Sequence, residues 1–207
     1  MIIAIDGTTS SGKGTLAKRL AAHFDLPHLD TGLLYRAVAA KALRERVDMT
    51  DAAACARLAE GLDLRDFNAH ELRGSRVGAE ASVVAAHGLV RRALFDMQRD
   101  FARQTPGAVL DGRDIGTVIA PDAGFKFWVD ASVEERARRR YLELAGMGET
   151  VTPEGVLALL KERDARDAGR KDAPSKPAED AVRIDTTTLT PDATVALAMH
   201  IITRHRL

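Results

Sequence analysis

Five short apolar runs recur along the chain, and an aspartate follows each of them. The runs are Ile2–Ile5, Leu26–Leu29, Ala108–Leu110, Phe125–Val129 and Val182–Ile184. Their hydrophobicity is continuous rather than alternating, which is typical of parallel strands covered on both faces. The aspartates are Asp6, Asp30, Asp111, Asp130 and Asp185. Each could simply cap a loop, but ligands bind at the carboxyl ends of parallel strands, so we expect these acids at the functional edge.

Helical periodicity fills the segments between the runs. The repeating apolar positions are Leu16, Leu20 and Phe24, then Val90, Leu94, Met97 and Phe101, and finally Val195, Met199 and Ile202. Helix start signals occur at three places: Ser132 with Glu135, Thr152-Pro153, and Thr190-Pro191. The third precedes the helix that contains Val195, and the other two indicate additional helices. A capping hydroxyl before a Glu or a first-turn Pro favours a helix N-terminus. Strands that alternate with helices predict a doubly wound α/β sheet.

The pattern weakens between about residues 48 and 86. There Asp63–Asn68 favours a small strand and a turn. We interpret this stretch as part of an insertion on a single α/β domain, since 207 residues suffice for one such domain.

The loop after the first apolar run carries the most specific chemistry. Gly7 and Gly12 bracket four residues, and Lys13 follows. Such a loop points backbone N–H groups at phosphate oxygens, the lysine adds a mobile charge, and the next helix adds its positive end. Here Gly14 stands between Lys13 and Thr15, where the usual pattern has Ser or Thr at once. The expected triphosphate-binding residues are Gly7, Thr8, Thr9, Ser10, Ser11, Gly12, Lys13, Gly14 and Thr15.

Because of this loop, we predict a P-loop NTPase fold of the α/β class, with a central five-stranded parallel sheet and helices on both faces. We expect one domain over residues 1–207, with a monophosphate-binding insertion at about 31–104 and a lid at about 132–170.

Acids and arginines gather in four further places. Thr31, Tyr35 and Arg36 follow the second run, and Asp111-Gly112-Arg113-Asp114 follows the third. An acid that ends a strand beside such a loop is where Mg²⁺ is held, usually through water, so Asp111 is the metal candidate. A plain β-turn remains the alternative, because Asp-Gly is a common turn pair.

Two later segments present arginines at helical spacing. Arg136, Arg139 and Arg140 share one face, and Arg163, Asp167 and Arg170 form a stripe. The first set could neutralise charge during phosphoryl transfer, although a solvated basic face would look the same. In the second, a carboxylate between two arginines could hold a ribose hydroxyl while the arginines bind phosphate.

Composition excludes several classes of protein. The formal net charge is zero and aromatic residues make up 4%, which argues against nucleic-acid binding and an acidic membrane partner. Cys55 is the sole cysteine, so we predict no disulfide and no cysteine-based metal site, and a buried inert thiol. We expect a cytoplasmic protein, since the chain shows no leader and no apolar span of membrane length.

Taken together, these segments resemble the bacterial cytidylate kinases, which belong to the nucleoside monophosphate kinases. The resemblance covers nearly the whole chain and rests on Ile-Asp-Gly through Gly-Lys-Gly-Thr, Leu-Asp-Thr-Gly-Leu-Leu-Tyr-Arg, Asp-Gly-Arg-Asp-Ile-Gly-Thr-Val, Asp-Ala-Ser-Val-Glu-Glu-Arg and Glu-Arg-Asp-Ala-Arg-Asp. It implies transfer of the ATP γ-phosphoryl group to CMP or dCMP, with Mg²⁺, in a protein that need not be more than a monomer.

The resemblance also implies residue roles. Lys13 and the loop hold ATP, and Arg136, Arg139 and Arg140 belong to a mobile lid. The acceptor phosphate is surrounded by Thr31, Tyr35, Arg36, Arg113, Arg163 and Arg170. Asp167 reaches the ribose, and Ser82, Arg91 and Asp114 correspond to residues around the cytosine ring.

One departure concerns the insertion. Only Leu64–Glu71 precedes Leu72-Arg73, where the family carries a longer strand-rich segment. A hairpin is therefore trimmed, which bears on lid closure and acceptor affinity. Two alternatives stay open: a kinase for UMP, AMP or a metabolite alcohol, and a switch that hydrolyses ATP or GTP.

Overall fold

All five predicted strands form, and they pair in parallel within one sheet of order β2-β3-β1-β4-β5. The structure is a computed structural model that describes residues 1–204. Its strands are β1 (Ile2–Gly7), β2 (His28–Asp30), β3 (Ala108–Gly112), β4 (Phe125–Asp130) and β5 (Val182–Asp185). The predicted α/β class with a five-stranded parallel sheet is confirmed, and the carboxyl ends of the strands meet at one edge.

Helices and helical turns connect the strands. They are α1 (Lys13–Phe24), α2 (Thr31–Glu45), α3 (Ala52–Ala59), η1 (Leu64–Asp66), α4 (Ala69–Arg73), α5 (Ser75–Val84), α6 (Gly88–Arg103), η2 (Ile115–Ile119), α7 (Val133–Gly146), α8 (Pro153–Ala168) and α9 (Pro191–Arg204). η1 is a short 3₁₀ turn, and η2 is a single π-helical turn.

The chain divides into two compact units, which are described separately. The sheet unit comprises Met1–Asp30, Arg99–Arg136 and the chain from Ser175 onward. The helical unit comprises Thr31–Gln98 and Ala137–Pro174. The expected insertion at 31–104 and lid at 132–170 stay predictions about function.

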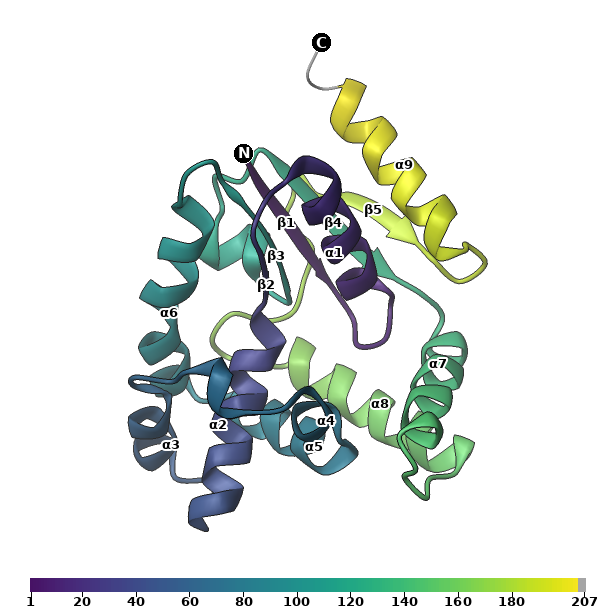
Figure 1. Cartoon of the computed structure of the whole chain (residues 1–207). Coiled ribbons are helices and arrows are strands. Elements are labelled where there is room, and N and C mark those ends of the chain that lie inside the picture. The colour runs from purple at the N-terminus through teal and green to yellow at the C-terminus, as the bar shows by residue number, and fades with distance from the viewer. Residues whose placement is uncertain (205–207) are drawn as a thin grey trace. The chain divides into compact units, whose positions relative to one another are not determined.

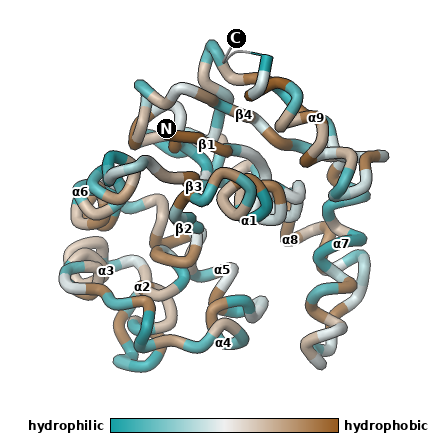
Figure 2. Tube along the Cα trace, turned by 45° about the horizontal axis from the view of Figure 1, so that its top comes forward, coloured by the Kyte–Doolittle hydropathy of each residue, from teal (hydrophilic) through white to brown (hydrophobic). Residues whose placement is uncertain are grey.

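The core of the sheet unit lies between the sheet and two helices. Leu16 and Leu20 of α1 and Ile202 of α9 pack with Ile5 of β1 and Phe127 of β4, all nearly inaccessible to solvent. Figure 1 shows α1 and α9 beside the strands, and Figure 2 shows β1 and β3 in brown, as expected for continuous apolar strands. This packing fixes β1, and β1 leads directly into the predicted phosphate-binding loop.

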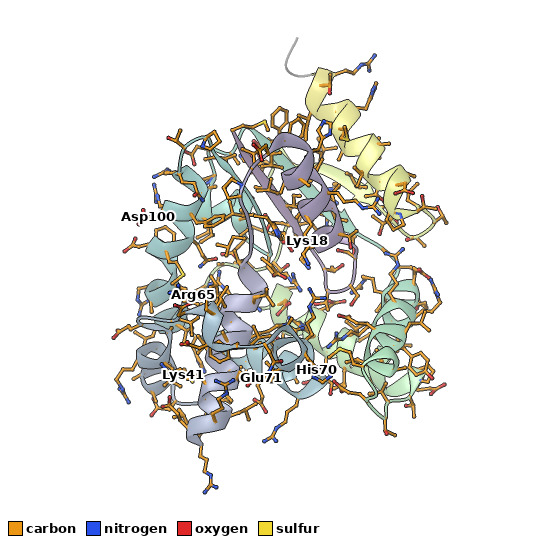
Figure 3. The ribbon with its side chains drawn as sticks, viewed as in Figure 1. Lys18, Lys41, Arg65, His70, Glu71 and Asp100 are labelled. Carbon is orange, nitrogen blue, oxygen red and sulfur yellow. The ribbon has the colours of Figure 1, made fainter. Side chains whose placement is uncertain are left out.

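The helical unit is organised around α2, whose residues are largely buried. Arg44 of α2 binds Glu71 of α4 through its Nε, 2.9 Å from Oε1, and lies 4.6 Å from the ring centre of Phe67. Figure 3 labels Glu71 on α4 and Lys41 on α2 in this part of the helical unit. These contacts fasten α4 and the segment around Phe67 to α2.

The small strand expected within Asp63–Asn68 is wrong. This segment forms the turn η1, and α4 and α5 follow it directly. The reason is capping: the Asp63 carboxylate accepts the Arg65 N–H, and the Asn68 side chain accepts the Glu71 N–H. Two capping residues so close together nucleate helical turns in a stretch that shows little apolar periodicity.

The predicted helix starts are confirmed by their hydrogen bonds. Thr152 accepts the Gly155 N–H at 3.1 Å, and Thr190 accepts the Ala193 N–H at 3.2 Å. The Ser132 hydroxyl accepts the Glu135 N–H at 3.3 Å. These bonds set the first residues of α8, α9 and α7, and so the phase of the arginines that follow.

Candidate functional site

Residues 7–15 comprise the last residue of β1, the connecting loop and the first turn of α1, and backbone geometry requires glycine at the start of the loop. Gly7 has φ 152°, and a Cβ there would lie 1.9 Å from the Val129 carbonyl oxygen of β4. Gly12 has φ 90°, and Ser10, a non-glycine, has φ 60°. Left-handed residues curl the chain so that successive N–H groups can face one point. The loop therefore has the backbone expected for phosphate binding.

Hydrogen bonds from three segments hold this loop in place. The Thr8 hydroxyl donates to Asp130 Oδ1 at 2.6 Å. The Ser11 hydroxyl donates to the Thr8 carbonyl at 2.9 Å, and the Thr186 hydroxyl donates to the Ser11 carbonyl at 2.7 Å. Asp130 ends β4 and Thr186 directly follows β5, so the sheet edge itself supports the loop. Asp130 was expected at this edge because it follows an apolar run, whereas no sequence signal indicated Thr186.

Two cations lie against the loop within the sheet unit. Lys13 Nζ donates to the Thr8 carbonyl at 3.3 Å. Arg136, which is buried, donates from Nε to the Ala131 carbonyl at 2.9 Å and from Nη1 to the Thr9 carbonyl at 3.4 Å. Its Nε is 3.6 Å from Asp130 Oδ1. The structure thus brings together Lys13 and Arg136 with the loop residues Thr8 and Thr9.

Asp111 ends β3 beside this loop, as predicted. Its carboxylate is buried, and a Cβ at Gly14 would lie 3.6 Å from Asp111 Oδ2. Its other oxygen, Oδ1, is 2.7 Å from His28 Nε2 on β2. His28 was not a predicted site residue, and its only sequence signal was its place in the second apolar run.

Arg113 and Asp114 follow β3, and a buried carboxylate on β1 holds the turn after them. Arg113 donates from Nη2 to Thr9 Oγ1 at 2.7 Å and from Nη1 to the Gly112 carbonyl at 3.0 Å. Asp114 is buried and directly precedes the turn η2.

Asp6 accepts the N–H of Ile115 and the N–H of Gly116, both at 2.8 Å. Burial raises the pKa of Asp6 to about 7, although both N–H groups oppose this rise.

In the helical unit, Asp167 of α8 is the centre of a buried polar cluster. Arg170 Nη2 donates to Asp167 Oδ1, and the Ser82 hydroxyl of α5 donates to the same oxygen at 3.2 Å. Arg163 Nε is 3.7 Å from Asp167 Oδ2, and Arg163 Nη1 donates to the Gly78 carbonyl at 3.3 Å. We call Ser82, Arg163, Asp167 and Arg170 the Asp167 cluster. The predicted stripe is therefore assembled, with Arg163 and Asp167 on α8 and Arg170 just after its end, and Ser82 of α5 joins it.

Arg36, Tyr35 and Arg91 form a second group in the helical unit. Arg36 Nη1 donates to the Leu72 carbonyl at 2.6 Å, and a Cβ at Gly78 would lie 3.1 Å from Arg36 Nη2. The Arg91 guanidinium lies 5.5 Å from the centre of the Tyr35 ring. Thr31, the first residue of α2, is buried at the same helix N-terminus.

Arg139 and Arg140 belong to the helical unit, whereas Arg136 belongs to the sheet unit. Arg140 is buried and donates from Nη2 to the Arg73 carbonyl at 2.9 Å and from Nη1 to Glu143 Oε2 at 2.7 Å. Arg139 is half-buried on the same helix. Nearby, Glu149 Oε1 accepts the Ser75 N–H at 2.9 Å. The segment around α7 is thus fastened to the α4–α5 junction, which the sequence did not indicate.

Comparisons with known proteins identify a family for this chain. The profile of the family described as cytidylate kinase matches residues 3–204. A cytidylate kinase of Methylocella silvestris is 56% identical over 202 residues, 98% of this chain and 94% of that protein. A cytidylate kinase of Xanthobacter autotrophicus is 53% identical over 206 residues, 100% of this chain and 99% of that protein.

A solved structure supports the fold. An uncharacterised protein of Eubacterium ventriosum has a TM-score of 0.54 at 16% identity, covering 98% of both chains. At that identity the likeness shows the fold alone. Among residues 1–204, no helix combines the length and the apolar character needed to cross a membrane. From the profile match and these relatives, the chain belongs to the cytidylate kinase family.

Proposed function

We propose that this protein transfers the γ-phosphoryl group of ATP to CMP or dCMP by direct in-line transfer, giving CDP or dCDP and ADP. Family membership supports the kinase activity. The observation that best supports a nucleotide acceptor is the Asp167 cluster, because a buried carboxylate with two arginines suits a nucleotide with a phosphate and a ribose. A hydrolytic switch has no need of such a second arginine-rich site.

The donor ATP would be bound by the sheet unit. Residues 7–15 would cradle its phosphates with backbone N–H groups, and Lys13 would leave the Thr8 carbonyl for the outer phosphates. Arg136 would add a fixed positive charge, because three oxygen partners already orient its guanidinium. Positioning and charge neutralisation then supply most of the catalysis, since phosphoryl transfer asks for little covalent chemistry.

The residues near Asp111 fit a magnesium ion that is held mainly by phosphates and water. Asp111 is a buried carboxylate beside Gly14 of the loop. Within residues 1–204, no three His, Cys, Asp or Glu side chains gather as a metal cage. Mg²⁺ usually binds through one or two carboxylates, several waters and substrate phosphates. Bound there, it would neutralise charge on the phosphates, and Asp111 would hold it through water.

The acceptor roles are proposed by residue. Arg163, Arg170 and Arg36 would bind the monophosphate, and Asp167 would accept a ribose hydroxyl. Thr31 and Tyr35 would complete the phosphate contacts in the helical unit, and Arg113 is proposed as a further phosphate ligand. Ser82, Arg91 and Asp114 would recognise cytosine, whose amino donor and ring acceptors match an acid beside an arginine and a hydroxyl.

Arg139 and Arg140 are proposed to act in a lid that excludes water. Water would otherwise accept the phosphoryl group and waste ATP. Arg140 is already oriented by Arg73 and Glu143. We further propose that the protein works as a cytoplasmic monomer.

A coupled assay of ADP formation tests the proposal. Initial rates are compared for CMP, dCMP, UMP and AMP at equal concentration, with a blank that lacks any acceptor. We expect CMP and dCMP to be fastest. A clear lead for UMP or AMP would replace the acceptor assignment, and an acceptor-independent rate as fast as the CMP rate would favour a hydrolytic switch.

A further inference from the structure

Asp6 lies between two segments to which the proposed function gives different tasks. It is the last residue before Gly7, where the phosphate-binding loop begins. In the sheet, Asp6 of β1 pairs with Gly112 of β3, directly before Arg113 and Asp114. Its side chain is almost completely buried.

Both oxygens of the Asp6 carboxylate are engaged by one backbone turn. Oδ1 accepts the Ile115 N–H and Oδ2 accepts the Gly116 N–H, each at 2.8 Å. These are the first N–H groups of η2, and the first N–H groups of a helical turn have no partner within it. A carboxylate with two acceptor oxygens satisfies both of them at once.

This arrangement replaces the usual cap of the turn. The residue before a helical turn commonly turns its own side chain back onto these N–H groups. Asp114 occupies that position, yet its side chain makes no capping hydrogen bond. Asp6 supplies the cap from another strand instead.

The groups around Asp6 are charged and close. Asp114 raises the pKa of Asp6 and Arg113 lowers it, so both act on this carboxylate electrostatically. Lys126 of β4 approaches from the side of Gly116, where a Cβ would lie 3.2 Å from Lys126 Cδ and 3.5 Å from Asp6 Oδ2. The Lys126 ammonium itself is bound to Asp180 at 2.7 Å.

We propose that Asp6 is a positioning residue that fixes the start of η2 and thereby orients Arg113 and Asp114 toward the acceptor nucleotide. The inference rests on the proposed function, because that function gives Arg113 and Asp114 their acceptor roles. Asp6 itself touches neither nucleotide in this proposal. Its effect therefore falls on the acceptor more than on ATP.

The test is Asp6→Asn, with Asp122→Asn as the matched control. Asn keeps the shape, but its NH₂ faces a backbone N–H, so one N–H of η2 loses its acceptor. The neutral side chain should be accommodated, since burial already favours the neutral form of Asp6. Asp122 is an exposed acid that follows the same turn and pairs with Arg103 at 3.2 Å.

Two readouts are taken on each folded variant. Steady-state kinetics should show the KM for CMP raised about tenfold or more in Asp6→Asn, with the KM for ATP within about twofold. Amide hydrogen exchange should show the Ile115 and Gly116 N–H groups exchanging at least about tenfold faster. Asp122→Asn should match the wild type in both. A merely structural role would lower stability without separating the two KM values.

Gly116→Ala gives a second, milder test that keeps Asp6. The added methyl group would press on Lys126 Cδ at 3.2 Å and would touch Asp6 Oδ2 at 3.5 Å, so it would disturb the side of the carboxylate that accepts the Gly116 N–H, and we expect a rise of about twofold to threefold in the KM for CMP alone. Should Asp6→Asn not fold, this variant decides the question.

Different failures have different signatures. Faster exchange with an unchanged KM for CMP would overturn the positioning role, as would unchanged exchange in Asp6→Asn. An unchanged KM in both variants would overturn it too. A wild-type protein that phosphorylates neither CMP nor dCMP would remove the proposed function, and the acceptor role of Asp6 with it.

Discussion

In the sheet unit the phosphate-binding loop is held largely through backbone groups, whereas in the helical unit the acceptor candidates hold one another through side chains. Thr186, Lys13 and Arg136 all donate to carbonyl oxygens of residues 7–15. Asp167, in contrast, binds Arg170, Arg163 and Ser82 directly. A loop fixed by its backbone tolerates changes in many side chains, but a side-chain cluster loses its partners when one member is removed.

The largest expected effect follows from removing Lys13, the one charged side chain of residues 7–15. Lys13→Ala should lower kcat by about 100-fold or more, because a positive charge at the transferred phosphate is lost. Thermal unfolding should change little, since the 3.3 Å bond from Lys13 to the Thr8 carbonyl stays within residues 7–15. The control is Lys18→Ala on the exposed side of α1. Normal CMP phosphorylation by folded Lys13→Ala would refute the role.

Next in size is Asp167→Asn, which removes the charge at the centre of the Asp167 cluster. The two arginines then lack their buried counter-charge, and breaking a buried pair costs about 3–5 kcal/mol of unfolding free energy. The KM for CMP should rise about tenfold or more, and the KM for ATP should stay within about twofold. Urea unfolding and steady-state kinetics measure these quantities. Glu162→Gln, on the exposed face of the same helix, is the control. Equal changes in both KM values would contradict a separate acceptor cluster.

A third prediction concerns pH and Asp6. Its pKa is about 7 in the folded protein and 3.8 in the unfolded chain, so the folded state binds more protons between these values. The free energy of unfolding therefore falls as pH rises from about 4 to 7, by an amount on the order of 4 kcal/mol at most. Urea unfolding at pH 5, 6, 7 and 8 should show this slope in the wild type but not in Asp6→Asn. Parallel pH profiles for the two proteins would contradict the raised pKa.

The smallest effect is expected at the exposed pair of Arg44 and Glu71. Glu71→Gln should lower the unfolding free energy by less than about 1 kcal/mol, because solvent screens a surface ion pair. The KM for CMP should not change. A loss as large as that of Asp167→Asn would show that burial does not separate the two kinds of ion pair in the helical unit.

The sequence predicted the parts of the fold that depend on local patterns. Continuous apolar runs identified all five strands, and capping residues such as Thr152 identified helix starts. The same logic failed between Asp63 and Asn68, where two caps lie so close that apolar periodicity has no room to develop. On α6 the apolar spacing included Met97, which is exposed, while Gln98 is buried and donates to the Leu94 carbonyl at 2.9 Å. A buried amide can find a hydrogen-bond acceptor within its own helix, and the hydropathy of the sequence does not reveal this.

The sequence indicated the candidate site residues by their type and spacing, but it did not indicate which residues they contact. Lys13, Asp111 and Asp167 stand out because charged residues follow strands or repeat at helical spacing. The partners of Asp6 and Asp111 lie more than 80 residues away in sequence, at Ile115 and His28. No local pattern relates such positions. Only the register between β1, β2 and β3 brings them together.

The Asp130 carboxylate gives the sheet unit a shared anchor. One of its oxygens, Oδ1, accepts the Thr8 hydroxyl and lies 3.6 Å from Arg136 Nε. If triphosphate binding displaced the loop, the movement would therefore reach the same Asp130 oxygen that lies beside Arg136 in the first turn of α7. Through this one carboxylate, the position of the first turn of α7 would depend on whether a triphosphate is bound.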